Sequence, residues 1–102
     1  MSDQKPDRIT SIALSHVVLP LKHEISDAKV FTGRQKPMTE VNFLFCELET
    51  ADGVSGVGFS YSKRAGGPAQ FAHAKEVAGN LIGEDPSDID RLRVKLLWAG
   101  AS

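Results

Sequence analysis

A short basic, glycine-rich segment is the part of the sequence whose residue types and spacing best suit a chemical role. Lys63 and Arg64 directly follow an apolar stretch, and Gly66 and Gly67 precede Pro68, where a helix is expected to begin. A glycine-rich turn at a helix N-terminus presents backbone N–H groups to an anion, and an arginine can hold a carboxylate or phosphate through two parallel hydrogen bonds. The pattern predicts an anion site, and its alternative is a solvated basic turn.

A second group of cations lies between residues 20 and 39. Within it, residues 29–39 contain Lys29, Arg34 and Lys36 and no acid. Loops of this length inside a compact domain are usually functional or disordered. Local sequence predicts a solvated surface loop, which would add positive charge to the basic turn if it folds toward it.

Other arrangements that could do chemistry are missing. His16, His23 and His73 fall in different predicted elements without metal-ligand spacing. Cys46 lies on an apolar strand face, which is typical of a core cysteine, and the glycines of residues 53–58 do not follow the dinucleotide-binding pattern. With no paired base and nucleophile and no cofactor motif, we expect no catalysis from this chain by itself.

Three segments have the pattern of β-strands. Residues 8–19 are β-branched and aliphatic and end at Pro20, and residues 40–50 form the strongest strand. Residues 54–60 follow an Asp-Gly pair, which is typical of a tight hairpin turn. We expect an antiparallel meander, in which the two glycines of the third strand leave one face bare and let another backbone approach closely.

Two helices are expected after the basic turn. The first carries apolar residues at helical spacing from Phe71 to Ile82, and Gly83 is placed to cap its C-terminus. The second is expected to begin with Asp85 as its N-cap and Pro86 in its first turn. Strands first and helices second predict an α+β fold, a three-stranded antiparallel meander followed by helices.

The middle strand is apolar on both faces in its first half. Val41, Phe43 and Phe45 lie opposite the face that carries Leu44 and Leu48. One layer of helices covers only one face of a sheet. We therefore expect the face of Val41 to be covered by something outside this segment, and in the isolated chain to be exposed or buried by self-association.

Composition limits the class of protein further. A chain of 102 residues allows one compact domain, and 12 Lys and Arg against 13 Asp and Glu argue against a general nucleic-acid binder. No apolar run approaches the ~20 residues that span a bilayer, and the polar start holds no signal core. A single cysteine excludes an internal disulfide. We expect a cytoplasmic protein without nucleic-acid or membrane partners, and residues 1–7 as a flexible lead-in.

Several stretches of the sequence resemble the N-terminal capping domain of the enolase superfamily, in its mandelate racemase/muconate lactonising branch. They are the strand pattern of residues 40–60 with its DGVSGVG turn, and the helical segment GEDPSDIDRLRVKLLWAG of residues 83–100. The loop sequences SDAKVFTGRQKP (26–37) and GVGFSYSKRAGG (56–67) resemble the acid-sugar dehydratases of that branch. Phe59 departs from the general pattern, since many members carry a glutamate there.

The resemblance implies a two-part enzyme, in which a lid covers the mouth of a (β/α)-barrel. The barrel of such an enzyme holds Mg²⁺ and the acid–base residues. A base removes the proton next to a substrate carboxylate, and the β-hydroxyl leaves as water. Residues 8–102 would be the lid and would end before the barrel, so this chain alone would hold no metal and would be inactive. We also expect identical subunits to associate.

The resemblance also implies which residues select the substrate. They lie in two loops and are Asp27, Ala28, Lys29, Lys63 and Arg64. A six-carbon acid-sugar dicarboxylate has one carboxylate far from the metal, and this distal carboxylate needs cations from the lid. Arg64 is the first choice to bind it, because its planar guanidinium matches a carboxylate. Asp27 would accept hydrogen bonds from sugar hydroxyls or orient Lys29.

Two alternatives use the same residues without catalysis. One is a stand-alone anion-binding domain built on the basic turn. The other is an interaction domain whose apolar strand face pairs with an identical chain. An open reading frame that continues past Ser102 into a barrel domain would favour the lid of an enzyme over both alternatives.

Overall fold

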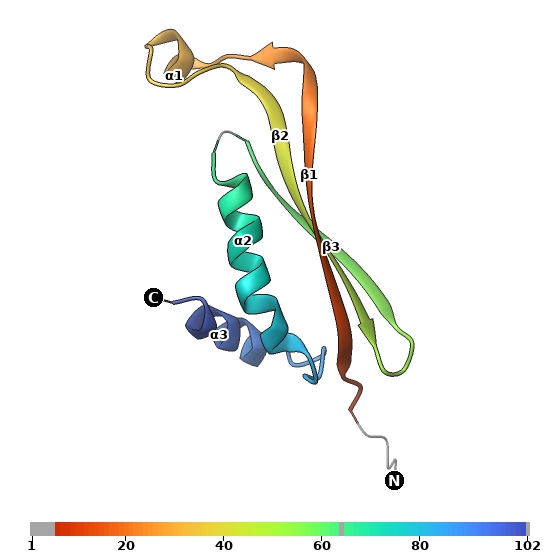
Figure 1. Cartoon of the computed structure of the whole chain (residues 1–102). Helices are drawn as coiled ribbons and strands as arrows, with labels where there is room; N and C mark the ends of the chain where they lie inside the picture. The colour runs from red at the N-terminus through yellow and green to blue at the C-terminus, as the bar shows by residue number, and fades with distance from the viewer. Residues whose placement is uncertain (1–5, 64, 102) are drawn as a thin grey trace.

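The fold is a three-stranded antiparallel sheet with helices on one side (Figure 1). The computed structural model describes residues 6–63 and 65–101. The sheet order is β1-β2-β3, and the strands are β1 (Ile9–Ile25), β2 (Met38–Thr50) and β3 (Ser55–Ser62). The helices are α1 (Ala28–Phe31), α2 (Gly67–Ala78), the 3₁₀ turn η1 (Gly79–Leu81) and α3 (Ile89–Ala99). The expected α+β meander is confirmed.

The hairpin between β2 and β3 forms at the predicted Asp-Gly pair. Gly53 has a φ of +83°, a conformation that glycine adopts at no steric cost. The backbone N–H of Thr50 donates to the carbonyl of Val54 at 2.9 Å and closes the turn. The register that follows places Phe45 opposite Phe59.

The first strand is longer than the sequence predicted. We expected it to stop at Pro20 before a long loop, but β1 continues to Ile25, and Pro20 pairs with Glu40 of β2. β1 is an edge strand, where a proline is tolerated because one side of the strand needs no N–H donor. The pairing becomes irregular between Pro20 and Ile25, and the loop shortens to residues 26–37.

The end of the second helix also differs from the prediction. α2 ends at Ala78 instead of Ile82 and passes into η1. Gly83 then adopts a φ of +84°, and its N–H donates to the carbonyl of Ile9 at 2.8 Å. The segment is therefore tied to the start of β1.

The last helix begins later than predicted. Its N-cap is Asp88, and Asp85 lies outside the helix. The Asp85 carboxylate accepts hydrogen bonds from the N–H and the hydroxyl of Ser87, at 3.0 and 2.8 Å. Such a local side-chain turn competes with helix formation, which accounts for the later start.

Helix α2 packs on the sheet face that carries His16 and Asn42. The Nε2 atom of His16 lies 2.7 Å from the Oδ1 atom of Asn42, and the His16 ring centroid lies 5.6 Å from that of Phe71 in α2. On β3, the hydroxyl of Ser60 accepts a hydrogen bond from the side-chain amide of Gln70 at 2.7 Å. All three strands therefore contribute to the sheet face on which α2 packs.

The opposite face of the sheet carries an aromatic patch, which we define as Phe43, Phe45, Phe59 and Tyr61. Neighbouring ring centroids lie 5.9 to 6.3 Å apart. Phe59 and Tyr61 are 66% and 54% exposed, and α2 and α3 lie on the other side of the sheet (Figure 1). Val41, Phe43 and Phe45, which the sequence predicted to be exposed in the isolated chain, are half-buried, although no helix in the described part of the chain packs on this face.

The space beside the glycines of β3 is open, which corrects another expectation. A Cβ added at Gly56 or Gly58 would meet no atom within 4 Å, so no other backbone approaches them among the described residues. The buried hydrophobic residues of the described chain are Ile9 and Leu92. The most buried apolar side chains therefore lie at the start of β1 and in α3.

Candidate functional site

The loop after β1 is organised by Asp27. Its carboxylate accepts hydrogen bonds from the backbone N–H groups of Lys29 and Val30 at 3.0 and 3.4 Å, and so caps α1. The hydroxyl of Thr32 donates to the carbonyl of Ala28 at 2.8 Å at the other end of the helix. The predicted solvated loop is therefore a capped turn that holds Lys29 in a defined place.

The start of α2, after the turn that follows β3, packs closely against β2. Gly66 is the N-cap of α2 with a φ of +90°, and Gly67 is buried. A Cβ added at Gly67 would meet the Asn42 side chain at 2.5 Å, so only glycine fits there without movement. The start of α2 therefore lies directly against β2.

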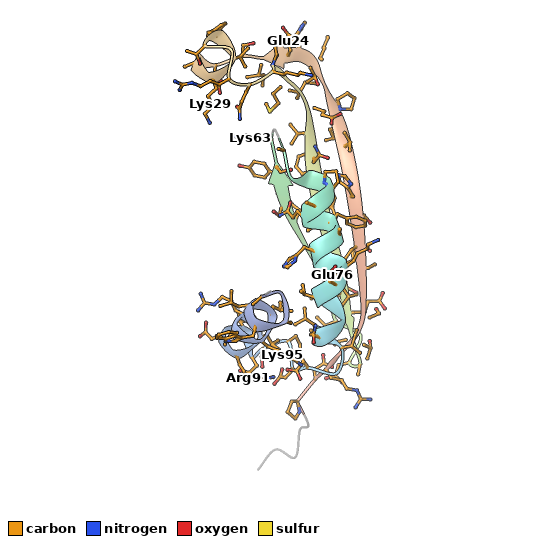
Figure 2. All side chains as sticks on the ribbon, turned by 60° about the vertical axis from the view of Figure 1, so that its left-hand side comes forward. Glu24, Lys29, Lys63, Glu76, Arg91 and Lys95 are labelled. Carbon is orange, nitrogen blue, oxygen red and sulfur yellow. The ribbon has the colours of Figure 1, made fainter. Side chains whose placement is uncertain are left out.

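The two loops meet around one cavity of about 560 Å³, which we call the loop cavity. Asp27 and Lys29 line it from the first loop, and Lys63 lines it from the second, together with Gln35 and Met38. Figure 2 shows Lys29 and Lys63 at the same end of the molecule. Three of the five sequence-predicted residues are therefore brought together from positions far apart in the chain.

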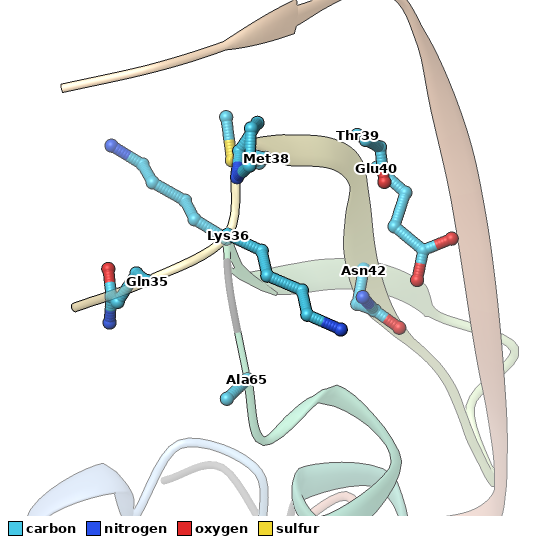
Figure 3. Close-up of a pocket in the computed structure, with 9 residues that line it drawn as sticks. Gln35, Lys36, Met38, Thr39, Glu40, Asn42 and Ala65 are labelled. Atoms are coloured by element: carbon cyan, nitrogen blue, oxygen red, sulfur yellow. The ribbon is translucent and has the colours of Figure 1, made fainter. Parts of the chain in front are cut away.

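A second cavity of about 320 Å³ adjoins the first and shares its walls at Gln35, Met38 and Lys63 (Figure 3). Lys36 and Glu40 are among its other lining residues. Each cavity is thus lined by two lysines and one carboxylate, which is Asp27 in the loop cavity and Glu40 in the second cavity.

The remaining predicted residues have other positions. Ala28 lies in α1 and lines neither cavity, and Arg64 lies outside the described residues. Gly67 faces Asn42 instead of either cavity. The expectation that the glycine turn adds backbone donors to the site stays a prediction.

Gln35 and Met38 are among the lining residues that the sequence did not predict. Both line the two cavities, and neither belongs to a motif that singles it out. Their neighbour Lys36 was noticed only for its charge, and Arg34, predicted with it, lines neither cavity. The loop sequence has no helical or strand periodicity, so it does not predict which of its side chains face a cavity.

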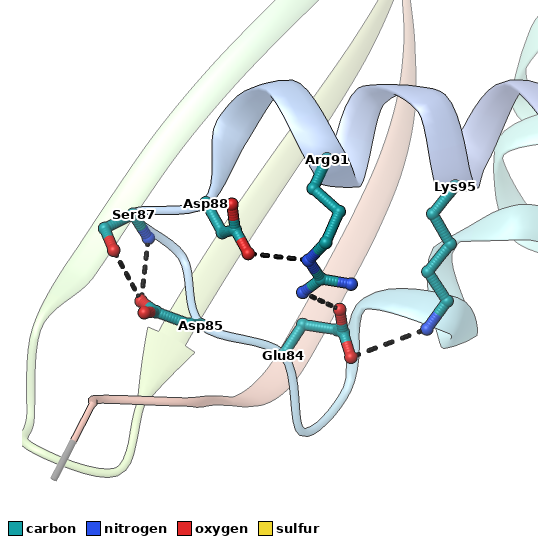
Figure 4. A network of polar contacts seen from close by, with 6 residues as sticks. All are labelled: Glu84, Asp85, Ser87, Asp88, Arg91 and Lys95. Atoms are coloured by element: carbon teal, nitrogen blue, oxygen red, sulfur yellow. Dashed lines mark hydrogen bonds and ion pairs between the residues drawn. The ribbon is translucent and has the colours of Figure 1, made fainter.

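An ion-pair network lies at the opposite end of the molecule (Figure 4). The guanidinium of Arg91 contacts Glu84 and lies 2.6 Å from Asp88, and the ammonium of Lys95 lies 3.6 Å from Glu84. The hydrogen bond from Arg91 lowers the pKa of Glu84 below its ordinary value. The network fixes α3 to the turn after η1, and we assign it a structural role.

The described residues offer no site for a metal ion. No group of three or more His, Cys, Asp or Glu side chains gathers anywhere in residues 6–63 and 65–101. Within the same residues, no helix is long and apolar enough to cross a membrane.

Comparison with known proteins gives close relatives, although no family model matches the chain. The sequence is 62% identical over 96 residues to L-talarate/galactarate dehydratase of Salmonella typhimurium strain LT2, and this match covers 94% of the chain and 24% of the relative. The crystal structure of L-talarate dehydratase from Polaromonas sp. JS666, complexed with Mg and L-glucarate, is similar with 68% identity and a TM-score of 0.87. That match covers 92% of this chain and 25% of the other.

A mandelate racemase/muconate lactonizing enzyme from Polaromonas sp. JS666 is also similar, with 54% identity, a TM-score of 0.79, and coverage of 94% and 23% of the two chains. The chain thus spans about a quarter of the length of these relatives. It is homologous to the N-terminal part of L-talarate/galactarate dehydratases and related mandelate racemase/muconate lactonizing enzymes of the enolase superfamily.

Proposed function

We propose that this chain is the substrate-selecting lid of a Mg²⁺-dependent acid-sugar dehydratase. The observation that carries the proposal is the loop cavity, where Asp27, Lys29 and Lys63 converge from two loops. The similarity to L-talarate/galactarate dehydratases supports the substrate class. Residues 8–102 form the lid in this proposal.

The chemistry of an acid-sugar dicarboxylate explains why a lid needs cations. The reaction removes the proton next to one carboxylate and expels the β-hydroxyl as water, so catalytic groups surround that end of the substrate. The distal carboxylate lies beyond their reach. Lys29 and Lys63 supply charge for it, and hydrogen bonds between an ammonium and a carboxylate are stronger than neutral ones.

Asp27 is a positioning residue in this proposal. Its carboxylate holds the N–H groups of Lys29 and Val30, so it orients the segment that carries Lys29. Arg64 remains a proposed ligand of the distal carboxylate on the basis of the resemblance, and Ala28 a proposed part of the same loop surface.

The catalytic work is assigned to a barrel domain outside this chain. The described residues do not fit a Mg²⁺ site, so the metal ligands and the acid–base residues belong to the barrel. The complete enzyme is placed in the cytoplasm as an oligomer of identical subunits. The lid alone binds no metal and performs no dehydration.

A chimera tests the proposal. This chain replaces the matching N-terminal residues of the Salmonella L-talarate/galactarate dehydratase, and the product is assayed with Mg²⁺ and galactarate. We expect the chimera to release keto-acid product and the 102-residue chain alone to release none.

Three outcomes would count against the proposal. A folded chimera that binds Mg²⁺ without activity would contradict the lid assignment. Turnover by the isolated chain that survives repurification would contradict the division between lid and barrel. Tight binding of simple carboxylates by the isolated chain would favour a stand-alone anion-binding domain.

A further inference from the structure

Asn42 lies at the boundary between the start of α2 and the second cavity, the one of about 320 Å³. It is half-buried in β2 and lines that cavity together with Glu40 and Lys63 (Figure 3). An asparagine amide has an oxygen that accepts hydrogen bonds and a nitrogen that donates two. The contacts of these two groups decide what Asn42 can bind.

The oxygen of the Asn42 amide is engaged within the fold. The Nε2 atom of His16 lies 2.7 Å from this oxygen, and because an amide oxygen only accepts, Nε2 carries the hydrogen. The start of α2 also packs against the group, since a Cβ at Gly67 would meet the Asn42 oxygen at 2.6 Å and its Cγ at 2.5 Å. His16 and α2 together fix the rotation of the amide.

The nitrogen of the same amide is left for a ligand. Within residues 6–63 and 65–101, no hydrogen bond engages the Nδ2 atom of Asn42. The oxygen and Cγ face His16 and Gly67, so Nδ2 is the polar atom with which the side chain can line the cavity. A donor that its neighbours already hold in place loses less conformational freedom on binding than a mobile one.

Glu40 adds an acceptor to the wall of this cavity. Glu40 and Asn42 are two positions apart in β2, so their side chains lie on the same face of the sheet. A carboxylate accepts hydrogen bonds, whereas the amide nitrogen donates them. A hydroxyl group can do both, so it is the group that suits a donor and an acceptor on one wall.

We propose that the second cavity binds a hydroxyl group of the acid sugar, with Asn42 as donor, Glu40 as acceptor and His16 as the residue that positions Asn42. The inference rests on the proposed function, because it takes the distal carboxylate to lie on Lys63, which lines both cavities. A carboxylate at this shared wall brings the hydroxyl of the neighbouring carbon toward the second cavity. The subsite therefore favours a hydroxylated diacid over a plain one.

Substrate discrimination by the chimera with the Salmonella enzyme provides the first test. Asn42→Asp keeps the acceptor for His16 and replaces the donor nitrogen with an oxygen of similar size. It should lower kcat/KM about tenfold more for galactarate than for an analogue without the hydroxyl beside the distal carboxylate. The added negative charge affects both substrates, so their ratio isolates the lost donor. Asn80→Asp, outside both cavities, is the control and should leave the ratio unchanged.

The positioning role of His16 has its own variants. His16→Phe keeps an aromatic ring against Phe71 and removes the hydrogen bond to Asn42, so it should lower the same ratio by a smaller factor. His16→Gln should restore the ratio, because its amide N–H can donate to Asn42. A purely structural role would lower kcat/KM equally for both substrates.

The side-chain amide signal of Asn42 provides a test without catalysis. In nuclear magnetic resonance spectra of the 102-residue chain, millimolar galactarate should shift this signal. Adipate, a six-carbon diacid without hydroxyls, should shift it much less. The side-chain amide signal of Asn80 is the internal control and should not move with either ligand.

The outcomes separate this inference from the proposed function. An inactive chimera, together with an Asn42 signal that responds to galactarate, would contradict the proposed function and support the hydroxyl subsite. An active chimera in which Asn42→Asp lowers kcat/KM equally for both substrates would overturn the subsite alone. An Asn42 signal that galactarate moves no more than adipate does would also overturn it.

Discussion

Gly67 lies so close to Asn42 that a Cβ on residue 67 would meet the Cβ and Cγ atoms of Asn42 at 2.5 Å. This contact joins the start of α2 to β2. A glycine at this position is therefore required by packing against a neighbouring strand.

The first prediction follows from this contact. Gly67→Ala should destabilise the chain by about 1–3 kcal/mol, the usual cost of overpacking a close contact, as measured by urea denaturation. Gly79→Ala is the control, because residue 79 has a helical φ of −59° and open space around it, and it should be neutral or stabilising by up to about 1 kcal/mol. Equal stabilities of the two variants would show that Asn42 yields without cost.

The second prediction concerns the cap of α1. Asp27→Ala should release the N–H groups of Lys29 and Val30, so their amide hydrogens should exchange faster with solvent. The loss of an N-cap costs about 0.5–2 kcal/mol, here confined to the loop. Asp27→Ser should retain most of the protection, since a serine hydroxyl also caps helices. Unchanged exchange in Asp27→Ala would show that the loop is held by other contacts.

The third prediction concerns acid stability. The pKa of Glu84 is lowered mainly by its hydrogen bond with Arg91, and the pKa of Asp85 is lowered by hydrogen bonds from Ser87. Because the folded-state pKa values are depressed, this stability is fully present above the unfolded values, about 4.3 for Glu and 3.9 for Asp. It is lost as the pH falls through the folded values.

The variant Arg91→Met tests this assignment in unfolding experiments between pH 2 and pH 7. It should reduce the loss of stability below about pH 4, because Glu84 then titrates closer to its ordinary value. Arg93→Met is the control, since Arg93 is highly exposed and its nearest ion-pair distance to Asp90 is 3.9 Å. A control that changes the profile as much as Arg91→Met would point to net charge as the cause.

The fourth prediction concerns substrate selection by the chimera with the Salmonella enzyme. Lys63→Met should lower kcat/KM for a diacid sugar about ten- to a hundredfold, because a hydrogen bond to a charged group contributes about 1.5–3 kcal/mol. A mono-acid sugar without the distal carboxylate should lose far less. Lys75→Met is the control, since Lys75 lies over the Phe71 ring and lines neither cavity of the candidate site. Equal losses on both substrates would give Lys63 a purely structural role.

A fifth prediction follows from the resemblance alone. Arg64→Ala in the same chimera should cause a loss of about the same size as Lys63→Met, about ten- to a hundredfold, again for the diacid substrate only. The measurement is kcat/KM for both substrates in both proteins. A loss that is equal for the mono-acid would show that Arg64 supports the turn instead of binding the second carboxylate.

The parts of the fold that rest on strand alternation and turn chemistry were predictable from the sequence. The alternation in residues 40–50 and the Asp-Gly pair give the β2–β3 hairpin, because both signals are local. The boundary at Pro20 was wrong for a non-local reason, since only the sheet order shows that β1 is an edge where proline is tolerated.

The candidate site was predictable only in its charged members. Lysines and aspartates are visible in a sequence, and the resemblance selected Asp27, Lys29 and Lys63, which the fold places around one cavity. Gln35 and Met38 were not predictable, because their positions depend on how the loop folds back onto the start of β2. The packing role of Gly67 was not predictable either, since Asn42, which it contacts, lies on β2 and is distant in the sequence.

The extension of β1 past Pro20 has a mechanical consequence. β3 ends opposite Asn42, so beyond that point only the ladder between β1 and β2 supports the loop that carries Lys29 (Figure 1). A two-stranded ribbon twists more easily than a wider sheet, whereas Lys63 directly follows β3, which is part of the three-stranded sheet. The distance between Lys29 and Lys63 therefore depends on how far this two-stranded ribbon bends, and the width of the loop cavity can change while α2 and α3 stay in place.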